Sequence, residues 1–236
     1  MEHTPTIRSK IETELKQRGY SFSSFSKISG INRGTFSTML NSNPPKPISV
    51  RQMDLITKAL GYPEGWLYEL YIDECFYEGK GHWKRIKPFL LRCGELGRKD
   101  YIQKVLSRLT EDLSYLPVIY ALAEELDANG KGGDAIPFYE CVIENEKYRY
   151  SERLAISQYK RFKACTMSDL EKSLELVLKF IPYRNLLPEH YQLEGIHKII
   201  NIYFYLHKWD EVEKYGHELK NLAYVIYMNQ QKRRRK

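Results

Sequence analysis

The chain has 236 residues, of which 42% are hydrophobic and 28% charged, a balance that fits a soluble globular protein and not a disordered one. No apolar run reaches the roughly 18 residues that a membrane span needs, and no signal-peptide pattern is present, so we expect a cytoplasmic protein without a membrane partner. The net charge of +7 is concentrated in residues 1–66, with 9 Lys/Arg against 5 Asp/Glu, and in the all-basic residues 232–236, which indicates a polyanionic partner.

Residues 1–66 contain the pattern of several short helices. Apolar residues recur at three- and four-residue spacing, and glycine or proline separates one such stretch from the next. Ser21 and Asn32 are suitable N-caps, and the Ser29-Gly30 pair allows a tight bend between two of the helices. The predicted helices lie at about 7–18, 22–29, 33–40 and 49–60, with a fifth that begins near Pro63.

The second and third of these helices have the anatomy of a helix-turn-helix. A recognition helix packs one face and presents small, hydrogen-bonding residues to the major groove on the other. Arg33 can bond a guanine bidentately, while Thr35, Ser37 and Thr38 can reach phosphates or a thymine methyl group. The alternative is an ordinary helical bundle whose polar face is only solvated.

The run from Tyr20 to Ser37 resembles the Cro/repressor (XRE-type) helix-turn-helix family, and residues 48–61 resemble that family's fourth helix. The resemblance covers about residues 6–66 and implies a lambda-repressor-like domain. It implies base contacts at Arg33, Gly34 and Thr38 and phosphate contacts near the start of the second helix. Gly34 departs from the family because it offers no side chain at a base-contact position. The expected DNA-contacting residues are Ser21, Ser23, Asn32, Arg33, Gly34, Thr35, Ser37 and Thr38.

From Trp66 onward the sequence predicts helix after helix and no convincing strand, so the expected fold class is all-α. The expected order is a five-helix domain over 1–66, a helical connector or degenerate repeat over 67–114, helical repeats over 115–230 and a basic tail over 231–236. The predicted helices lie at about 65–78, 82–95, 99–111, 115–129, 133–146, 151–164, 168–180, 188–206 and 209–228.

Residues 115–228 resemble tetratricopeptide repeats, which stack helix pairs into an α-solenoid. Leu122, Ala123 and Leu126, followed by Ala135 and Tyr139, fit the pattern of large and small apolar residues in one such pair. A second, looser fit follows near Ile199 and Val212. The alternative is an irregular helical domain. In such arrays the first helix of each pair lines the concave side, where extended peptides usually bind. The residues expected there are Tyr120, Glu124, Asp127, Glu194, His197, Asn201 and Tyr205.

The order of the two parts resembles the RRNPP-type quorum-sensing regulators of Gram-positive bacteria. That resemblance implies a homodimer on a palindromic double-stranded DNA operator, controlled by a short signalling peptide. The chain is shorter than most such regulators, which suggests either a natural short form or part of a longer array. Two rival functions stay open: a tetratricopeptide protein-interaction adaptor without an operator, and a constitutive repressor without a ligand.

Nothing in the sequence predicts an enzyme, a cofactor or a metal site. The chain has no H-x-x-x-H pair, no C-x-x-C pair, no G-x-S-x-G elbow and no phosphate-binding loop. We expect the cysteines to be small apolar packing residues in a reducing compartment. They are Cys75, Cys93, Cys141 and Cys165.

Overall fold

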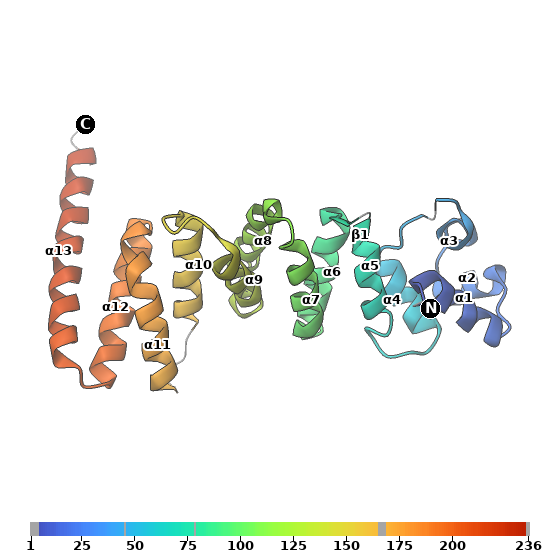
Figure 1. Cartoon of the computed structure of the whole chain (residues 1–236), viewed down its shortest axis with the longest axis horizontal. Helices are drawn as coiled ribbons and strands as arrows, with labels where there is room; N and C mark the ends of the chain where they lie inside the picture. The colour runs from blue at the N-terminus through green and yellow to red at the C-terminus, as the bar shows by residue number, and fades with distance from the viewer. Residues whose placement is uncertain (1–4, 45, 78, 165–168, 235–236) are drawn as a thin grey trace. The chain divides into compact units, whose positions relative to one another are not determined.

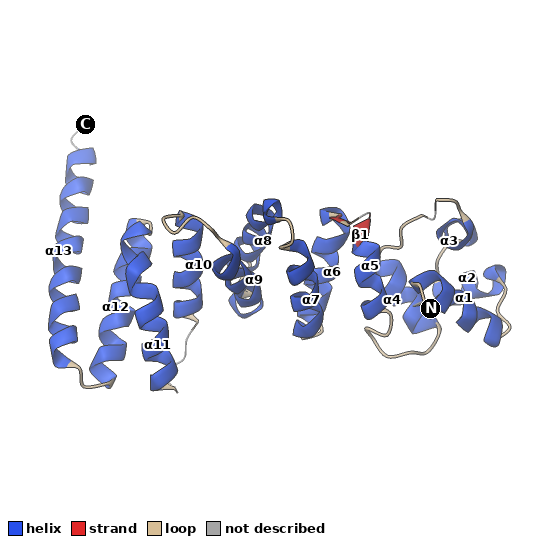
Figure 2. Cartoon of the chain, viewed as in Figure 1, coloured by secondary structure: helices blue, strands red, loops and turns tan. Residues whose placement is uncertain are grey.

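The structure is a computed structural model that describes residues 5–44, 46–77, 79–164 and 169–234. Its regular elements are helices apart from one short antiparallel hairpin, so the prediction of a helical protein is confirmed (Figures 1 and 2). The chain divides into two compact units, residues 1–109 and 110–236. Among the described residues, no helix is both long enough and apolar enough to cross a membrane.

The first unit begins with four helices that match the predicted ones to within about two residues. The prediction of a fifth helix beginning near Pro63 is wrong. The helix begins at Tyr68 because Gly65 has φ 83°, a left-handed value that a right-handed helix does not accommodate. The elements are α1 (Ile7–Gln17), α2 (Phe22–Ser29), α3 (Arg33–Asn41), α4 (Val50–Ala59), α5 (Tyr68–Cys75), β1 (Phe76–Tyr77), β2 (Lys80–Gly81), α6 (Trp83–Glu95) and α7 (Lys99–Leu109).

Helices α5 to α7 belong to the same compact unit as the first four. The buried Tyr71 hydroxyl on α5 donates a hydrogen bond to the Ile48 carbonyl at 2.9 Å. Arg8 on α1 donates hydrogen bonds to the carboxylate of Glu74 on α5. The predicted domain boundary at residue 66 therefore lies inside this unit.

The second unit continues the helical pattern, and its helices begin and end within two residues of the predicted positions, with one exception. Helix α13 continues to Arg234 because residues 229–234 contain no glycine or proline to end it. The elements are η1 (Leu113–Tyr115), α8 (Leu116–Ala128), α9 (Gly132–Asn145), α10 (Glu152–Lys163), α11 (Leu170–Phe180), η2 (Ile181–Leu186), α12 (Glu189–Tyr205) and α13 (Trp209–Arg234).

Successive helices of the second unit pack against each other from α8 to α13. Ala135 and Tyr139 on α9 are both buried, as expected for the small and aromatic positions of a helix pair. Gly195 on α12 lies against the ring of Phe180, and a side chain at that position would collide with it. The absence of a side chain thus lets α12 approach α11 closely.

Candidate functional site

The turn between α2 and α3 is fixed by local hydrogen bonds. Ser21 Oγ accepts a hydrogen bond from the Ser24 amide at 3.1 Å, which caps α2. Asn32 Oδ1 accepts one from the Gly34 amide at 2.8 Å, which caps α3. Between them, Gly30 closes α2 at φ 72°, in the left-handed region that favours glycine. These three residues set where each helix starts and stops.

Two aromatic rings hold the inner faces of α2 and α3 together. Phe25 and Phe36 are fully buried, with ring centroids 5.3 Å apart. None of the residues predicted to contact DNA is buried. Thr35 and Ser37 are half-buried. The exposed ones are Ser21, Ser23, Asn32, Arg33, Gly34 and Thr38.

Some of these side chains are already engaged within the chain. The oxygens of Ser21 and Asn32 serve as helix caps, and the Thr38 hydroxyl donates to the Thr35 carbonyl at 2.9 Å. Arg33 differs, because within the described residues its guanidinium makes no hydrogen bond or ion pair. An exposed guanidinium at the start of a short helix is free to meet a base edge or a phosphate.

Gly34 has a local structural reason. A Cβ built at this position would lie 3.2 Å from Asn32 Oδ1, the oxygen that caps α3. A side chain here would crowd the cap, so glycine at this position preserves the start of the helix. Because Gly34 has no side chain and is exposed, the α3 backbone is accessible at this point.

Residues 1–66 have more unpaired basic side chains than the difference between their 9 basic and 5 acidic residues suggests. Glu14 is paired with Lys10 and Arg18, at 3.8 and 3.5 Å, so that carboxylate is already neutralised. Within the described part of the segment, six basic side chains are exposed and make no ion pair. They are Lys16, Lys27, Arg33, Lys46, Arg51 and Lys58. Unpaired cations of this kind favour binding to a polyanion.

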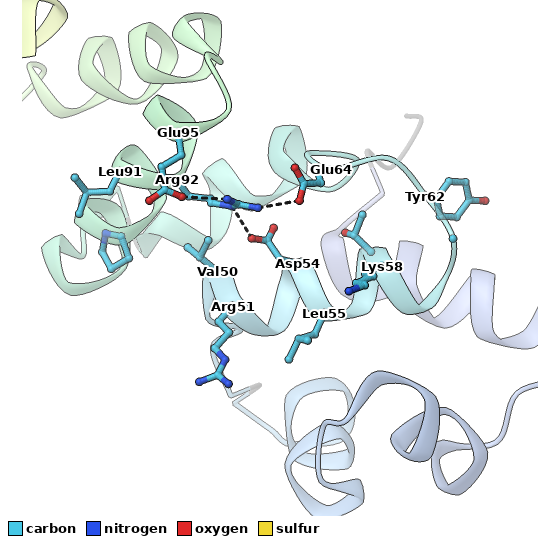
Figure 3. A pocket seen from close by; sticks show the side chains of 13 residues that line it. Val50, Arg51, Asp54, Leu55, Lys58, Tyr62, Glu64, Leu91, Arg92 and Glu95 are labelled. Atoms are coloured by element: carbon cyan, nitrogen blue, oxygen red, sulfur yellow. Dashed lines mark hydrogen bonds and ion pairs between the residues drawn. The ribbon is translucent and has the colours of Figure 1, made fainter. Parts of the chain in front are cut away.

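A hollow of about 810 Å³ lies between α4 and α6 in the first unit (Figure 3). Arg92 on its wall donates hydrogen bonds to Asp54, Glu64 and Glu95, each at 3.0 Å. The bonds to Glu95 and Asp54 raise the pKa of Arg92, although burial opposes them, so the guanidinium stays charged. The bond to Asp54 joins α6 to α4. Arg92 also pairs with Asp54 and Glu64, which are two of the acidic residues within 1–66, so their charges are balanced from outside that segment.

The second unit contains a groove of about 490 Å³ between α10 and α12. It brings together four of the residues predicted to bind peptide: Glu194, His197, Asn201 and Tyr205. The repeat pattern did not predict its other lining residues, because the helix at 151–164 fits neither repeat. A usable signal was Tyr159 and Lys163, which lie four residues apart on α10. The missed residues are Tyr159, Lys163 and Lys198.

The groove is crossed by polar contacts between α10 and α12. Lys163 Nζ lies 2.7 Å from a carboxylate oxygen of Glu194, and Lys198 Nζ donates to the Lys163 carbonyl at 2.6 Å. Burial acts to raise the pKa of Glu194, but Lys163 and Tyr159 outweigh it and lower that pKa. The groove therefore presents a charged carboxylate and an exposed Asn201 amide, which can both donate to and accept from a peptide backbone.

The other predicted peptide-binding residues do not line this groove. Glu124 accepts a hydrogen bond from the buried Tyr139 hydroxyl, and Tyr120 packs partly buried against the core of the α10–α13 region. Asp127 is paired with Lys160. These contacts join neighbouring helices, which gives the three side chains a structural role.

The cysteines that the structure describes are buried. Burial raises the pKa of each thiol to about 12, so each stays protonated at neutral pH. These residues are Cys75, Cys93 and Cys141. Cys165 lies outside the described residues.

Comparison of the chain with protein-family models, with curated proteins and with solved structures gives no match. The helix-turn-helix and tetratricopeptide resemblances therefore stay predictions.

Proposed function

We propose that the protein is a sequence-specific DNA-binding transcriptional regulator that acts as a homodimer. In this proposal α1 to α5 form a lambda-repressor-like helix-turn-helix domain, and α8 to α13 form a tetratricopeptide-like array. Two copies of α3 enter successive major grooves of a palindromic site, about 34 Å apart. The observation that carries the proposal is the exposed, unpaired Arg33 at the capped start of α3.

The chemistry of the α2–α3 surface supports base readout as well as charge attraction. A guanidinium can donate two parallel hydrogen bonds to guanine, which distinguishes that base from the others. The remaining cations of residues 1–66 supply contacts to phosphate that carry no sequence information. Specificity and affinity are therefore expected to depend on different residues.

The test is binding of the purified protein to DNA from its own upstream region, with a shuffled competitor, across a salt series. Arg33→Ala should lower the ratio of specific to non-specific affinity by about 5- to 150-fold, the equivalent of ~1–3 kcal/mol. Arg51→Ala is the matched control, because Arg51 is also exposed and unpaired but lies on α4. It should leave that ratio unchanged and at most weaken binding to every sequence equally.

Binding that ignores sequence and disappears as salt rises would reduce the DNA claim to charge attraction. Equal losses on all sequences for Arg33→Ala would remove its base-reading role. In the first case the adaptor function, which uses the α10–α12 groove without an operator, becomes the better explanation.

We also propose that a short peptide bound in the α10–α12 groove regulates the protein. The support is the convergence of Glu194, Asn201 and Tyr205 on one groove of about 490 Å³. Peptides from cell-free culture fluid should raise the melting temperature of the wild type, and Asn201→Ala should reduce that rise. A melting temperature that never responds would favour a constitutive repressor without a ligand.

A further inference from the structure

The C-terminal half of α13 carries an apolar run that the rest of the described chain does not cover. Tyr224, Val225, Tyr227 and Met228 are 64%, 53%, 57% and 39% exposed, whereas Ile226 between them is buried. Figure 1 shows this part of α13 extending past the end of α12. A helix that is apolar on several sides is normally buried, so the run lacks a neighbour.

A groove lies along the same helix. It has a volume of about 520 Å³, and its apolar wall is formed by Ile196 on α12 and by Leu222 and Val225 on α13. His217, Asn221 and Val225 all line it, and their four-residue spacing places them in one stripe along α13. An apolar groove and an uncovered apolar run therefore lie on one helix.

The charges of α13 are divided along its length. Its first ten residues, 209–218, contain four acidic residues and one lysine, whereas residues 219–234 contain four basic residues and no acidic one. Two such helices repel each other when they lie parallel, and they attract when they lie antiparallel. The acidic residues are Asp210, Glu211, Glu213 and Glu218, and the basic ones are Lys220, Lys232, Arg233 and Arg234.

We propose that a second copy of this chain docks on the α13 groove, with the two α13 helices antiparallel about a two-fold axis near Leu222. A residue that lies a given number of positions after Leu222 in one copy then faces the residue that lies the same number of positions before Leu222 in the other. The run 224–228 of one copy lies along residues 216–220 of the other, beside the groove. Glu211, which already forms an ion pair with Lys214 of its own helix at 3.0 Å, lies beside Arg233 of the partner subunit.

The arrangement is isologous, so each copy covers the apolar run of the other and the contact closes at two copies. It deepens the dimeric regulator proposed above by naming the surface that holds the dimer. It depends on the second unit alone, and its test contains no DNA. A result that contradicts the proposed interface therefore does not contradict DNA binding, and a result that contradicts DNA binding does not contradict the interface.

The first test is the mass of the 236-residue chain in solution by sedimentation and light scattering. Since one chain is 28.0 kDa, the wild type should have twice that mass, and Val225→Glu with Met228→Glu should return it to 28.0 kDa. Tyr150→Glu is the matched control, because Tyr150 is 87% exposed on the loop between α9 and α10, and it should stay dimeric. Circular dichroism verifies that each variant keeps its helices.

A monomeric wild type at about 0.1 mM, where even a micromolar interface is filled, would overturn the proposal. So would a double variant that folds and stays dimeric, because the interface would then lie elsewhere.

The second test distinguishes the antiparallel arrangement from a parallel one by disulfide cross-linking. Asn221 lies one residue from the proposed axis, so Asn221→Cys should join the two chains under mild oxidation. Lys214 lines the same groove but lies eight residues from the axis. At 1.5 Å per residue its two copies are about 24 Å apart, well beyond the roughly 7 Å that a disulfide spans. Lys214→Cys should therefore not cross-link.

The wild type gives the background from its own cysteines. Cross-linking at both positions would show a parallel pair. A dimer that cross-links at neither position would place the interface on another surface. Either result contradicts the proposed arrangement, and cross-linking at Asn221→Cys alone supports it.

Discussion

Replacing Gly195 by alanine tests the closest helix contact in the second unit. A Cβ at this position would lie 2.8 Å from Phe180 Cζ and 2.9 Å from Phe180 Cε1, which is below a normal van der Waals distance. The ring has little room to move, because it is fully buried and stacked on Phe162 with centroids 4.8 Å apart. The substitution therefore has to push α12 away from α11 or distort the core.

Two effects of opposite sign determine the size of the change. Alanine is about 1 kcal/mol better than glycine inside a helix, whereas overpacking a filled core costs about 1–3 kcal/mol. Because two ring atoms lie inside contact distance, we expect an overpacking cost in the upper part of that range, about 2–3 kcal/mol, and hence a net loss of about 1–2 kcal/mol. For a unit of this size that lowers the melting temperature by about 3–8 °C.

The assay is urea and thermal unfolding of the full chain followed by circular dichroism, fitted as two transitions because the chain has two units. Gly133→Ala on α9 is the matched control, since nothing lies within 4 Å of its new Cβ and the residue is far from the proposed dimer contact on α13. It should stabilise the second unit by about 0.5–1 kcal/mol. A Gly195→Ala protein that is stabilised to the same extent would refute the argument for close packing at this site.

Three further predictions follow from local contacts. Asn32→Ala should destabilise the first unit by about 1 kcal/mol through loss of the α3 cap, and an unchanged melting temperature would contradict this. Burial acts to raise the pKa of Glu146, but hydrogen bonds from Arg153 outweigh it and lower that pKa. The ionised carboxylate therefore adds stability above its unfolded pKa of about 4.3, and the stability difference between wild type and Glu146→Gln should shrink as pH falls from 7 through 4. A difference that is independent of pH would count against the ion pair. In the folded protein no more than one of the four thiols should react quickly with a thiol reagent at pH 8, because three are buried and protonated. All four should react after unfolding. Rapid modification of a second thiol in the folded protein would show that burial does not protect them. The protected thiols are Cys75, Cys93 and Cys141.

The positions of the helices could be predicted from the sequence because their signals are local. Asn32 and Ser21 cap the helices that follow them, and Gly30 ends α2, as their residue types indicate. The hairpin of β1 and β2 was missed because two residues per strand are too few to show alternation. The late start of α5 depends on the positive φ of Gly65, which the sequence does not reveal.

The candidate sites were harder to predict because they depend on contacts between helices. His197, Asn201 and Tyr205 lie four residues apart on α12, so the periodicity of a single helix predicts that they share one face, and all three line the groove. Glu124 fits the same template on α8, yet Tyr139 on the neighbouring helix takes its carboxylate. Which partner a polar side chain finds depends on packing, and periodicity carries no information about it.

The hydrogen bonds that join the first four helices to α5 and α6 bear on how this protein can evolve. Tyr71 donates to a backbone carbonyl beside α4, and Arg92 holds Asp54 on α4. A gene fusion that exchanged only residues 1–66 would discard both partners and leave polar groups of the α4 region without them. Recombination is expected to be tolerated near residue 110, between the two compact units. Residues 1–109 are therefore expected to be inherited or exchanged as one whole segment.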